Sequence, residues 1–277
     1  MDHVEDLRAD CARCSALCCV ALPYATSADF ADDKPAGRPC RHLDDFACSI
    51  HAQLPERGFS GCTVFDCLGA GQQVTQHTYG GLTWRERPDL AGEIFSVFLI
   101  MRQLQELRWY LRQADRGDQP AEVRRRVLRL ADQTAVLAEL PPDELLQCDV
   151  AGHRAVVDDV LGEVSRRVRR EAVRAVRDRS GRPRNTRRAD LVGAKLPGAD
   201  LRGCDFRGAL LLGADLRRSD LRGADLIGAD LRAADLRGAD LSTALYVTEP
   251  QVTAAHGDAG TRLPAGVRRP PRWTRGA

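Results

Sequence analysis

Residues 189–243 read ADLVG, AKLPG, ADLRG, CDFRG, ALLLG, ADLRR, SDLRG, ADLIG, ADLRA, ADLRG and ADLST without a gap. A period of five would move the leucine by about 140° at each step around a helix. On a straight strand it would put successive leucines on opposite faces. The chain must therefore turn after every unit, with the first and third residues inside and the second outside. Glycine ends eight of the eleven units, as a tight corner favours.

This stretch resembles the pentapeptide-repeat family, whose motif is A(D/N)LXX. The resemblance implies a right-handed quadrilateral β-helix over residues 189–247, with four units in each coil. Residues twenty apart would then stack at about the 4.8 Å spacing of strands. The expected inward columns are Leu191, Leu211 and Leu231; Leu196, Leu216 and Leu236; Leu201, Leu221 and Leu241; and Phe206, Leu226 and Tyr246. Cys204 occupies a small alanine position, so we expect it to be core filler.

The outward positions of the repeats carry nine Asp and eight basic residues. Some members of the family inhibit DNA gyrase with an acidic, DNA-like rod, but this near-neutral stretch of under three coils disfavours that function. We expect Arg202 and Arg222 to offset the stacked carboxylates of the neighbouring column. Val192, Leu210 and Leu212 form an apolar stripe, which we expect to dock against the helical region or a protein partner.

Residues 248–277 are predicted to close the end of this solenoid, which needs capped ends. Thr248 and Gln251 form a capping-box pattern, and Gly257 is a helix stop signal, so a short helix is expected at about 249–256. The tail resembles the terminal segment of some bacterial pentapeptide-repeat proteins, with Leu263 and Trp273 available to cover the core.

The first quarter of the chain is rich in cysteine. Eight of the ten cysteines lie within residues 11–67, and no run resembling a secretory signal precedes them: Cys11, Cys14, Cys18, Cys19, Cys40, Cys48, Cys62 and Cys67. In a cytoplasmic protein such density favours metal ligation, with disulfide or redox pairing as the alternative. We therefore predict a Cys-rich metal-binding domain over residues 1–82.

The pattern of these cysteines resembles the CxxCxxxCC family, described as zinc- or iron-chelating and often as iron–sulfur oxidoreductase-like. The first four cysteines fit its opening motif, and the other four fit its later positions. Gly58 follows Arg57 where the family has proline, and Thr63 follows Cys62 where the family has arginine. The resemblance therefore implies metal binding more directly than any activity that depends on those two positions.

The spacing does not identify the metal. Four thiolates suit tetrahedral Zn²⁺, and four also suit an iron–sulfur cluster, so eight could form two sites or one site with spare thiols. His42, His51 and His77 are candidate ligands that we expect to lie at the surface or beside the ligands. Cys148 lies apart and is predicted to be a half-buried residue at a helix end.

Residues 83–180 are predicted to form a helical region. Pro88 suits a first helical turn, and apolar residues then recur at threes and fours in three segments, which favours an antiparallel bundle. Residues 166–188 hold eleven Arg against two acidic residues, including an Arg-rich linker at 181–188. This run indicates either a solvated linker or a binding site for an anionic partner at Arg166–Arg188.

The fold class is thus multidomain α+β: a Cys-rich metal-binding head, a helical bundle and a quadrilateral β-helix. The 277 residues carry 41 basic and 39 acidic side chains, which excludes a globally basic DNA-coating protein. There is no apolar run of membrane-spanning length and none of the common catalytic motifs. We expect a cytoplasmic, non-enzymatic metal-binding protein with a scaffold for protein interaction. The alternatives are an iron–sulfur redox protein and, more weakly, a nucleic-acid or DNA-topoisomerase-associated regulator.

Overall fold

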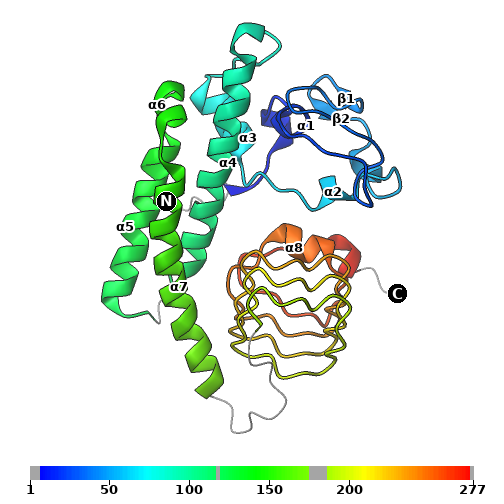
Figure 1. The fold of residues 1–277 in the computed structure, drawn as a ribbon, viewed down its shortest axis with the longest axis vertical. Helices are drawn as coiled ribbons and strands as arrows, with labels where there is room; N and C mark the ends of the chain where they lie inside the picture. Colours follow the sequence, from blue (N-terminus) through cyan, green and yellow to red (C-terminus); the bar gives the residue numbers. More distant parts are fainter. Residues whose placement is uncertain (1–6, 117–118, 175–185, 275–277) are drawn as a thin grey trace. The chain divides into compact units, whose positions relative to one another are not determined.

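The computed structural model describes residues 7–116, 119–174 and 186–274 (Figure 1). The chain divides into two compact units, Met1–Val160 and Leu161–Ala277. Within the described residues, no helix is both long enough and apolar enough to cross a membrane.

The helices of the first unit follow the predicted apolar stripes. They are α4 (Ala91–Ala114), α5 (Ala121–Ala138), α6 (Pro142–Gln147) and the beginning of α7 (Val150–Arg174). Pro88 starts a 3-10 turn, so α4 begins only at Ala91. The stripe of α4 is fully buried: Ile94, Phe98, Met101, Leu104, Leu107 and Leu111. Thr134 of α5 hydrogen-bonds His153 of α7 at 2.8 Å, which joins two helices through polar side chains.

The Cys-rich region contains only short regular elements. Its helices are α1 (Leu17–Ala21), α2 (Ser60–Thr63) and α3 (Ala70–Gln72), with a π-helical turn at Gln73–Thr78 and 3-10 turns at Cys11–Arg13 and His51–Gln53. Strands β1 (Leu43–Asp44) and β2 (Ala47–Cys48) pair antiparallel, with Leu43 opposite Cys48. Ile50, Leu54 and Phe59 form a small core beside the stacked rings of Tyr24 and Phe30. Such a small core favours additional cross-links between loops.

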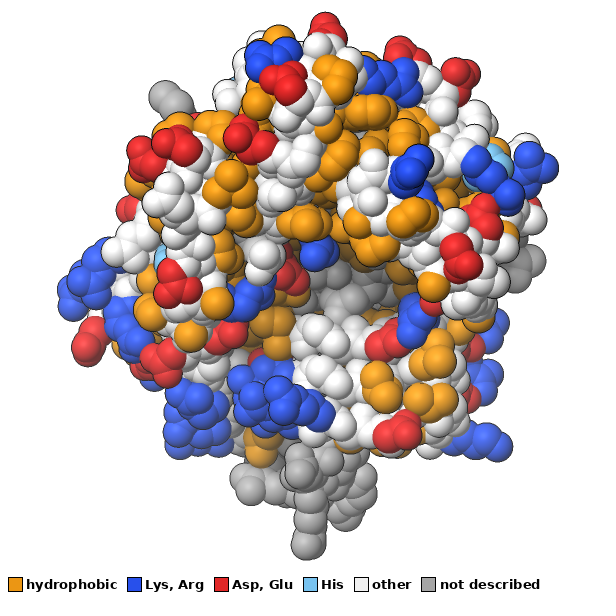
Figure 2. Space-filling model, turned by 45° about the horizontal axis from the view of Figure 1, so that its top comes forward, with side chains coloured by type: hydrophobic (Ala, Val, Ile, Leu, Met, Phe, Trp, Pro, Cys, Tyr) orange, Lys and Arg blue, Asp and Glu red, His pale blue; other side chains and the backbone are white. Residues whose placement is uncertain are grey.

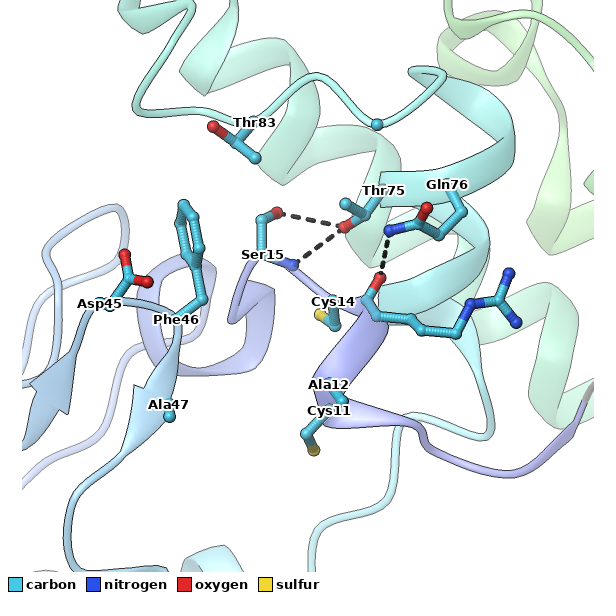
Figure 3. Close-up of a pocket in the computed structure, with 12 residues that line it drawn as sticks. Cys11, Ala12, Cys14, Ser15, Asp45, Phe46, Ala47, Thr75, Gln76 and Thr83 are labelled. Carbon is cyan, nitrogen blue, oxygen red and sulfur yellow. Dashed lines mark hydrogen bonds between the residues drawn. The ribbon is translucent and has the colours of Figure 1, made fainter.

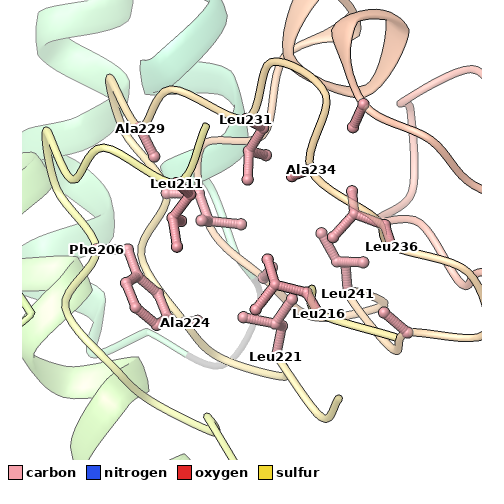
Figure 4. Packing of buried hydrophobic residues seen from close by; sticks show 14 of the residues in the cluster. Phe206, Leu211, Leu216, Leu221, Ala224, Ala229, Leu231, Ala234, Leu236 and Leu241 are labelled. Atoms are coloured by element: carbon pink, nitrogen blue, oxygen red, sulfur yellow. The ribbon is translucent and has the colours of Figure 1, made fainter. Parts of the chain in front are cut away.

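The second unit contains the β-helix. Parallel bridges join residues twenty apart, beginning with Asp190 and Leu210, so four units form each coil as predicted. The predicted inward columns fill the core (Figure 4): Leu211, Leu216, Leu221, Leu226, Leu236, Leu241, Phe206 and Tyr246 are fully buried. Cys204 is 7% exposed and packs in this core, which confirms its predicted role as filler.

Arginine side chains on the coil surface pair with aspartates of the repeats. Arg222 lies 2.5 Å from Asp220 of its own unit and 3.8 Å from Asp240 of the next coil. Arg202 contacts Asp200 at 2.9 Å and Asp220 at 3.4 Å. The expected compensation of the stacked carboxylates is therefore confirmed. On a neighbouring face, the hydrogen bond from Arg217 lowers the pKa of Asp215 to about 2.

The C-terminal end of the β-helix is closed by α8 (Glu249–Ala254) and the residues that follow it. Thr248 and Gln251 form the predicted capping box, and the helix ends at Ala254, before Gly257. Trp273 is 3% exposed in the core cluster, with Leu263 partly buried against it. The tail also extends the sheets, because His256 bridges to Asp235 and Arg262 to Asp240.

Candidate functional site

The loop that carries the first cysteines is fixed to the helical part of its unit. Thr75 Oγ1 accepts a hydrogen bond from the Ser15 amide at 3.1 Å, and Gln76 donates to the carbonyl of Arg13 at 2.8 Å. Trp84 Nε1 donates to the Ser15 carbonyl at 2.8 Å. Ala16 then takes a left-handed conformation with φ of 58°, which turns the chain into α1. The segment between Cys11 and Cys18 is therefore held from several sides.

A cavity of about 340 Å³ adjoins this loop (Figure 3). Cys11 and Cys14 line it together with Ser15, Phe46, Thr75 and Thr83. Cys14 and Cys67 both lie beside Gly71, where an added Cβ would come within 2.5 Å of the Cys14 sulfur and 3.9 Å of the Cys67 sulfur. The last cysteine of the motif therefore returns to the first loop.

The thiols interact electrostatically in two overlapping sets, because Cys19 of the second set also acts on Cys11 and Cys18 of the first. The first thiol set is Cys11, Cys14, Cys18 and Cys67; the second thiol set is Cys19, Cys40, Cys48 and Cys62. In the first set, burial and, to a smaller extent, the charges of Cys67 and Cys11 raise the pKa of Cys14 to about 11. In the second set, burial raises the pKa of Cys62 to about 11, with added effects from Cys19, Cys40 and Cys48.

The two sets meet at the adjacent residues Cys18 and Cys19, whose sulfur atoms are 3.9 Å apart. The hydrogen bond from Cys18, aided by the charge of Lys34, lowers the pKa of Cys19 to about 7. The Cys40 amide donates to the Cys19 carbonyl at 2.9 Å, and Tyr24 Oη donates to the Cys40 sulfur at 3.3 Å. Cys19 is thus the thiol of this pair that ionises more readily.

A buried lysine lies next to the second thiol set. Lys34 is 5% exposed, and its Nζ donates to the carbonyls of Val20 at 3.0 Å, Pro35 at 3.3 Å and Arg38 at 2.9 Å. No carboxylate among the described residues pairs with Lys34. Burial lowers the pKa of its ammonium group, and the charges of Cys40, Cys19, Cys18 and Cys62 partly offset this effect. A buried ammonium group without a counter-charge is costly, so the anionic forms of these thiols are its natural partners.

The candidate ligands are close but are not gathered into a finished coordination shell. In the ranges 7–116, 119–174 and 186–274, no three His, Cys, Asp or Glu side chains form a group that could hold a metal ion. Cys11 and Cys62 are exposed, and the other six are half-buried. His51 and His77 are exposed, while His42 packs edge-on against Phe59. Cys148 is half-buried at the end of α6, as predicted.

The donor chemistry of the two thiol sets fits a soft metal. Each set offers four thiols, the number that zinc and iron–sulfur centres use. All ten cysteines are free of disulfides in the described structure. Lys34 supplies a positive charge beside the second set, which suits a centre of four thiolates that keeps excess negative charge.

The face of the β-helix that bears Asp205 and Asp225 carries the last turns of α7. Ser165 Oγ donates to Asp225 at 2.5 Å, and Tyr246 Oη donates to the Leu161 carbonyl at 2.9 Å. An added Cβ at Gly223 would come within 2.7 Å of Ala172, so this corner must be glycine for the helix to approach. Sequence reasoning missed this face, although Ile227, Leu245 and Val247 mark it with apolar residues at outward positions.

The expected docking of the apolar stripe against a helix is not seen within the second unit, where α7 uses the other face. Val192, Leu210 and Leu212 remain 53%, 46% and 36% exposed. The α7 helix packs instead on the Asp225 face. There, Ser165 and Tyr246 form buried hydrogen bonds that add to the apolar contacts between the helix and the coil. Within the second unit, the stripe therefore remains exposed.

Only the beginning and end of the arginine run belong to the described residues. Arg166–Arg174 lies on α7, whereas residues 175–185, which include most of the predicted linker, lie outside the described residues. Figure 2 shows Lys and Arg side chains gathered densely on part of the face drawn, while Asp and Glu side chains are scattered over it.

Comparison with known proteins supports the interpretation of the repeats. The family described as "Pentapeptide repeats" matches residues 187–223 and 204–242, in 8 copies. "Uncharacterized protein YybG" of Bacillus subtilis (strain 168) is 51% identical over 270 residues, which cover 97% of this chain and 95% of that protein.

Solved pentapeptide-repeat structures resemble only a part of the chain. Rfr23 of the cyanobacterium Cyanothece 51142 is 30% identical over 28% of this chain and 56% of its own, with a TM-score of 0.24. A protein of the Arabidopsis thaliana thylakoid lumen is 34% identical over 24% of this chain and 54% of its own, with a TM-score of 0.13. The chain thus spans about half the length of these two structures.

Proposed function

We propose that this chain, which belongs to one protein family with YybG of Bacillus subtilis and carries pentapeptide repeats, is a non-enzymatic metal-binding protein. The ligands are the eight thiols of the two sets, and the metal is Zn²⁺ or iron in an iron–sulfur cluster. The β-helix serves as a scaffold for a protein partner. A bound metal would fix the loops of a region whose own apolar core is small.

The observation that carries the metal proposal is the buried lysine. The Lys34 ammonium group donates to three carbonyl oxygens and interacts electrostatically with nearby thiols, and no carboxylate among the described residues balances its charge. A set of thiolates around a cation of charge +2 would leave net negative charge beside Lys34. The lysine would then stabilise the loaded site and orient the carbonyls of the loops that carry Cys19 and Cys40.

Replacement of Lys34 by Gln tests this proposal, because Gln keeps donors for the carbonyls and removes the charge. We expect the K34Q variant to bind Zn²⁺ about tenfold more weakly than the wild type, by competition with a chromogenic chelator. The matched control is K195Q, at the only other lysine of the chain, which is exposed on the β-helix. Equal zinc affinity of K34Q and the wild type would show that the charge of Lys34 does not stabilise the metal site.

An iron–sulfur redox protein is the second candidate function. The observation that favours it is the cavity beside Cys11 and Cys14, which gives a small redox partner access to the first thiol set. A redox role requires bound iron and a broad absorption band near roughly 400 nm in protein purified without oxygen. A colourless zinc protein contradicts it.

For the scaffold, the proposed contact surface is the exposed stripe of Val192, Leu210 and Leu212. Exposed apolar side chains that line up on one face of a rigid coil favour a protein partner. We expect a photo-cross-linking residue at position 212 to give a discrete adduct in cells. The same residue at position 217, exposed on a neighbouring face, should give none. Equal yields from both positions would contradict a specific contact at the stripe.

A further inference from the structure

The last turns of α7 and one corner of the β-helix enclose a second pocket, within the unit Leu161–Ala277. Its volume is about 390 Å³, and its lining consists of Arg166, Arg169, Arg170, Val173, Arg174 and Gly203. Four of the six residues are arginines, so their apolar stems and their charged ends both line the pocket.

The charges of this pocket are not balanced. Arg169 is neutralised, because its guanidinium contacts Asp205 at 2.9 Å and the Gly203 carbonyl at 3.0 Å. Arg166, Arg170 and Arg174 are exposed and have no ion-pair partner among the described residues. Glu171, which follows Arg170 directly in sequence, lies 3.4 Å from Arg167. Within the described residues, three positive charges therefore remain at the pocket.

These three arginines lie in one row. They are four residues apart along α7, so their side chains share one face of the helix and succeed one another at about 6 Å. Arg170 Nε donates to the Arg166 carbonyl at 3.1 Å, which ties two of them together. Ser165 and Arg169 fix the helix to the β-helix by bonds to Asp225 and Asp205, so the row has a rigid support.

The helix end itself works against an anion. The last carbonyls of α7 carry about half a negative charge, which weakens anion binding near Arg174. Three guanidinium groups exceed this partial charge several-fold, and each offers a planar fork of donors that matches a phosphate. The balance therefore favours a ligand with several closely spaced negative charges over a single carboxylate.

We propose that the Arg166–Arg170–Arg174 pocket binds linked phosphate groups. The pocket has no aromatic side chain in its lining, so a base would find no stacking platform and the phosphates would supply the affinity. Linked phosphates occur in nucleoside triphosphates and in the backbone of nucleic acids. Both sources share the chemistry that the row of arginines recognises.

Calorimetric titration of the full-length protein tests this proposal with three probes: inorganic triphosphate, a 20-base-pair DNA duplex and poly-glutamate. We expect triphosphate to bind at low salt and to bind more weakly as salt increases. The R166Q/R170Q variant should lose about tenfold in affinity, a change of roughly 1.4 kcal/mol. The matched control is R125Q/R129Q, which removes two exposed arginines at the same spacing from α5.

The outcomes separate the sources. Binding of triphosphate alone assigns the pocket to a small phosphorylated ligand, and additional binding of DNA with the same arginine dependence assigns it to a nucleic-acid backbone. The proposal is overturned if triphosphate does not bind, if poly-glutamate binds equally well through the same arginines, or if the control variant loses as much affinity. Both variants change exposed side chains, and their thermal unfolding should match that of the wild type.

Discussion

Replacement of Cys62 by Ser should release the metal of the second thiol set and unfold the loops around it. Structural Zn²⁺ contributes on the order of 10 kcal/mol to small domains that depend on it. The core beneath these loops consists of Ile50, Leu54 and Phe59, which is too small to replace that contribution. We therefore expect one metal equivalent fewer and fast amide hydrogen exchange over residues 34–63.

The matched control is Cys148→Ser, which changes a half-buried thiol that belongs to neither set. This variant should keep its full metal content, and its amide hydrogens at residues 34–63 should exchange as slowly as in the wild type. The β-helix should stay protected in both proteins, because its coils bond to one another and to the tail. If C62S keeps the metal content of the wild type, Cys62 is not a ligand.

Replacement of Asp225 by Ala should give the second large effect, in the other unit. Asp225 is fully buried, accepts hydrogen bonds from Ser165 Oγ and the Ile227 amide, and lies 3.5 Å from Arg207. The substitution removes the acceptor of the Ser165 hydroxyl and the Ile227 amide beneath α7, whereas Arg207 keeps its ion pair with Asp205 at 2.9 Å. We expect the free energy of unfolding of this unit to fall by about 3–5 kcal/mol, measured by urea denaturation.

Asp225→Asn is the control for this prediction. Burial raises the pKa of Asp225, so the ionised carboxylate carries a desolvation cost that its neighbours must offset. Asn avoids that cost and keeps one acceptor oxygen, so D225N should lose less stability than D225A. A loss below about 1 kcal/mol for D225A would show that α7 does not depend on this contact.

The repeat region could be predicted in detail from the sequence, because its period leaves little choice. A residue of small volume, an aspartate and a leucine at fixed spacing determine which side chains face inward, and Phe206 and Tyr246 lie in the column expected for them. The capping box of Thr248 and Gln251 could also be predicted from the sequence, because it depends on two residues that are three positions apart. Short-range sequence patterns are enough to predict a structure whose contacts repeat at short, regular intervals along the chain.

The position of α7 and the role of Lys34 could not be predicted, because both depend on contacts distant in sequence. Ser165 and Asp225 are sixty residues apart, and neither residue type indicates its partner. Lys34 resembles any surface lysine in the sequence and becomes notable only when its Nζ is found among three carbonyls. The division of the thiols into two sets likewise depends on Cys67 returning to Gly71 and Cys14.

The metal content of the wild-type protein, purified without oxygen and fully reduced, tests the central proposal most directly. Elemental analysis and absorption spectroscopy should find up to two tightly held equivalents of zinc, or bound iron with its visible band. Removal of the metal by a chelator should expose the amides of residues 11–67 to exchange. A protein that holds neither element and keeps those amides protected would contradict the account.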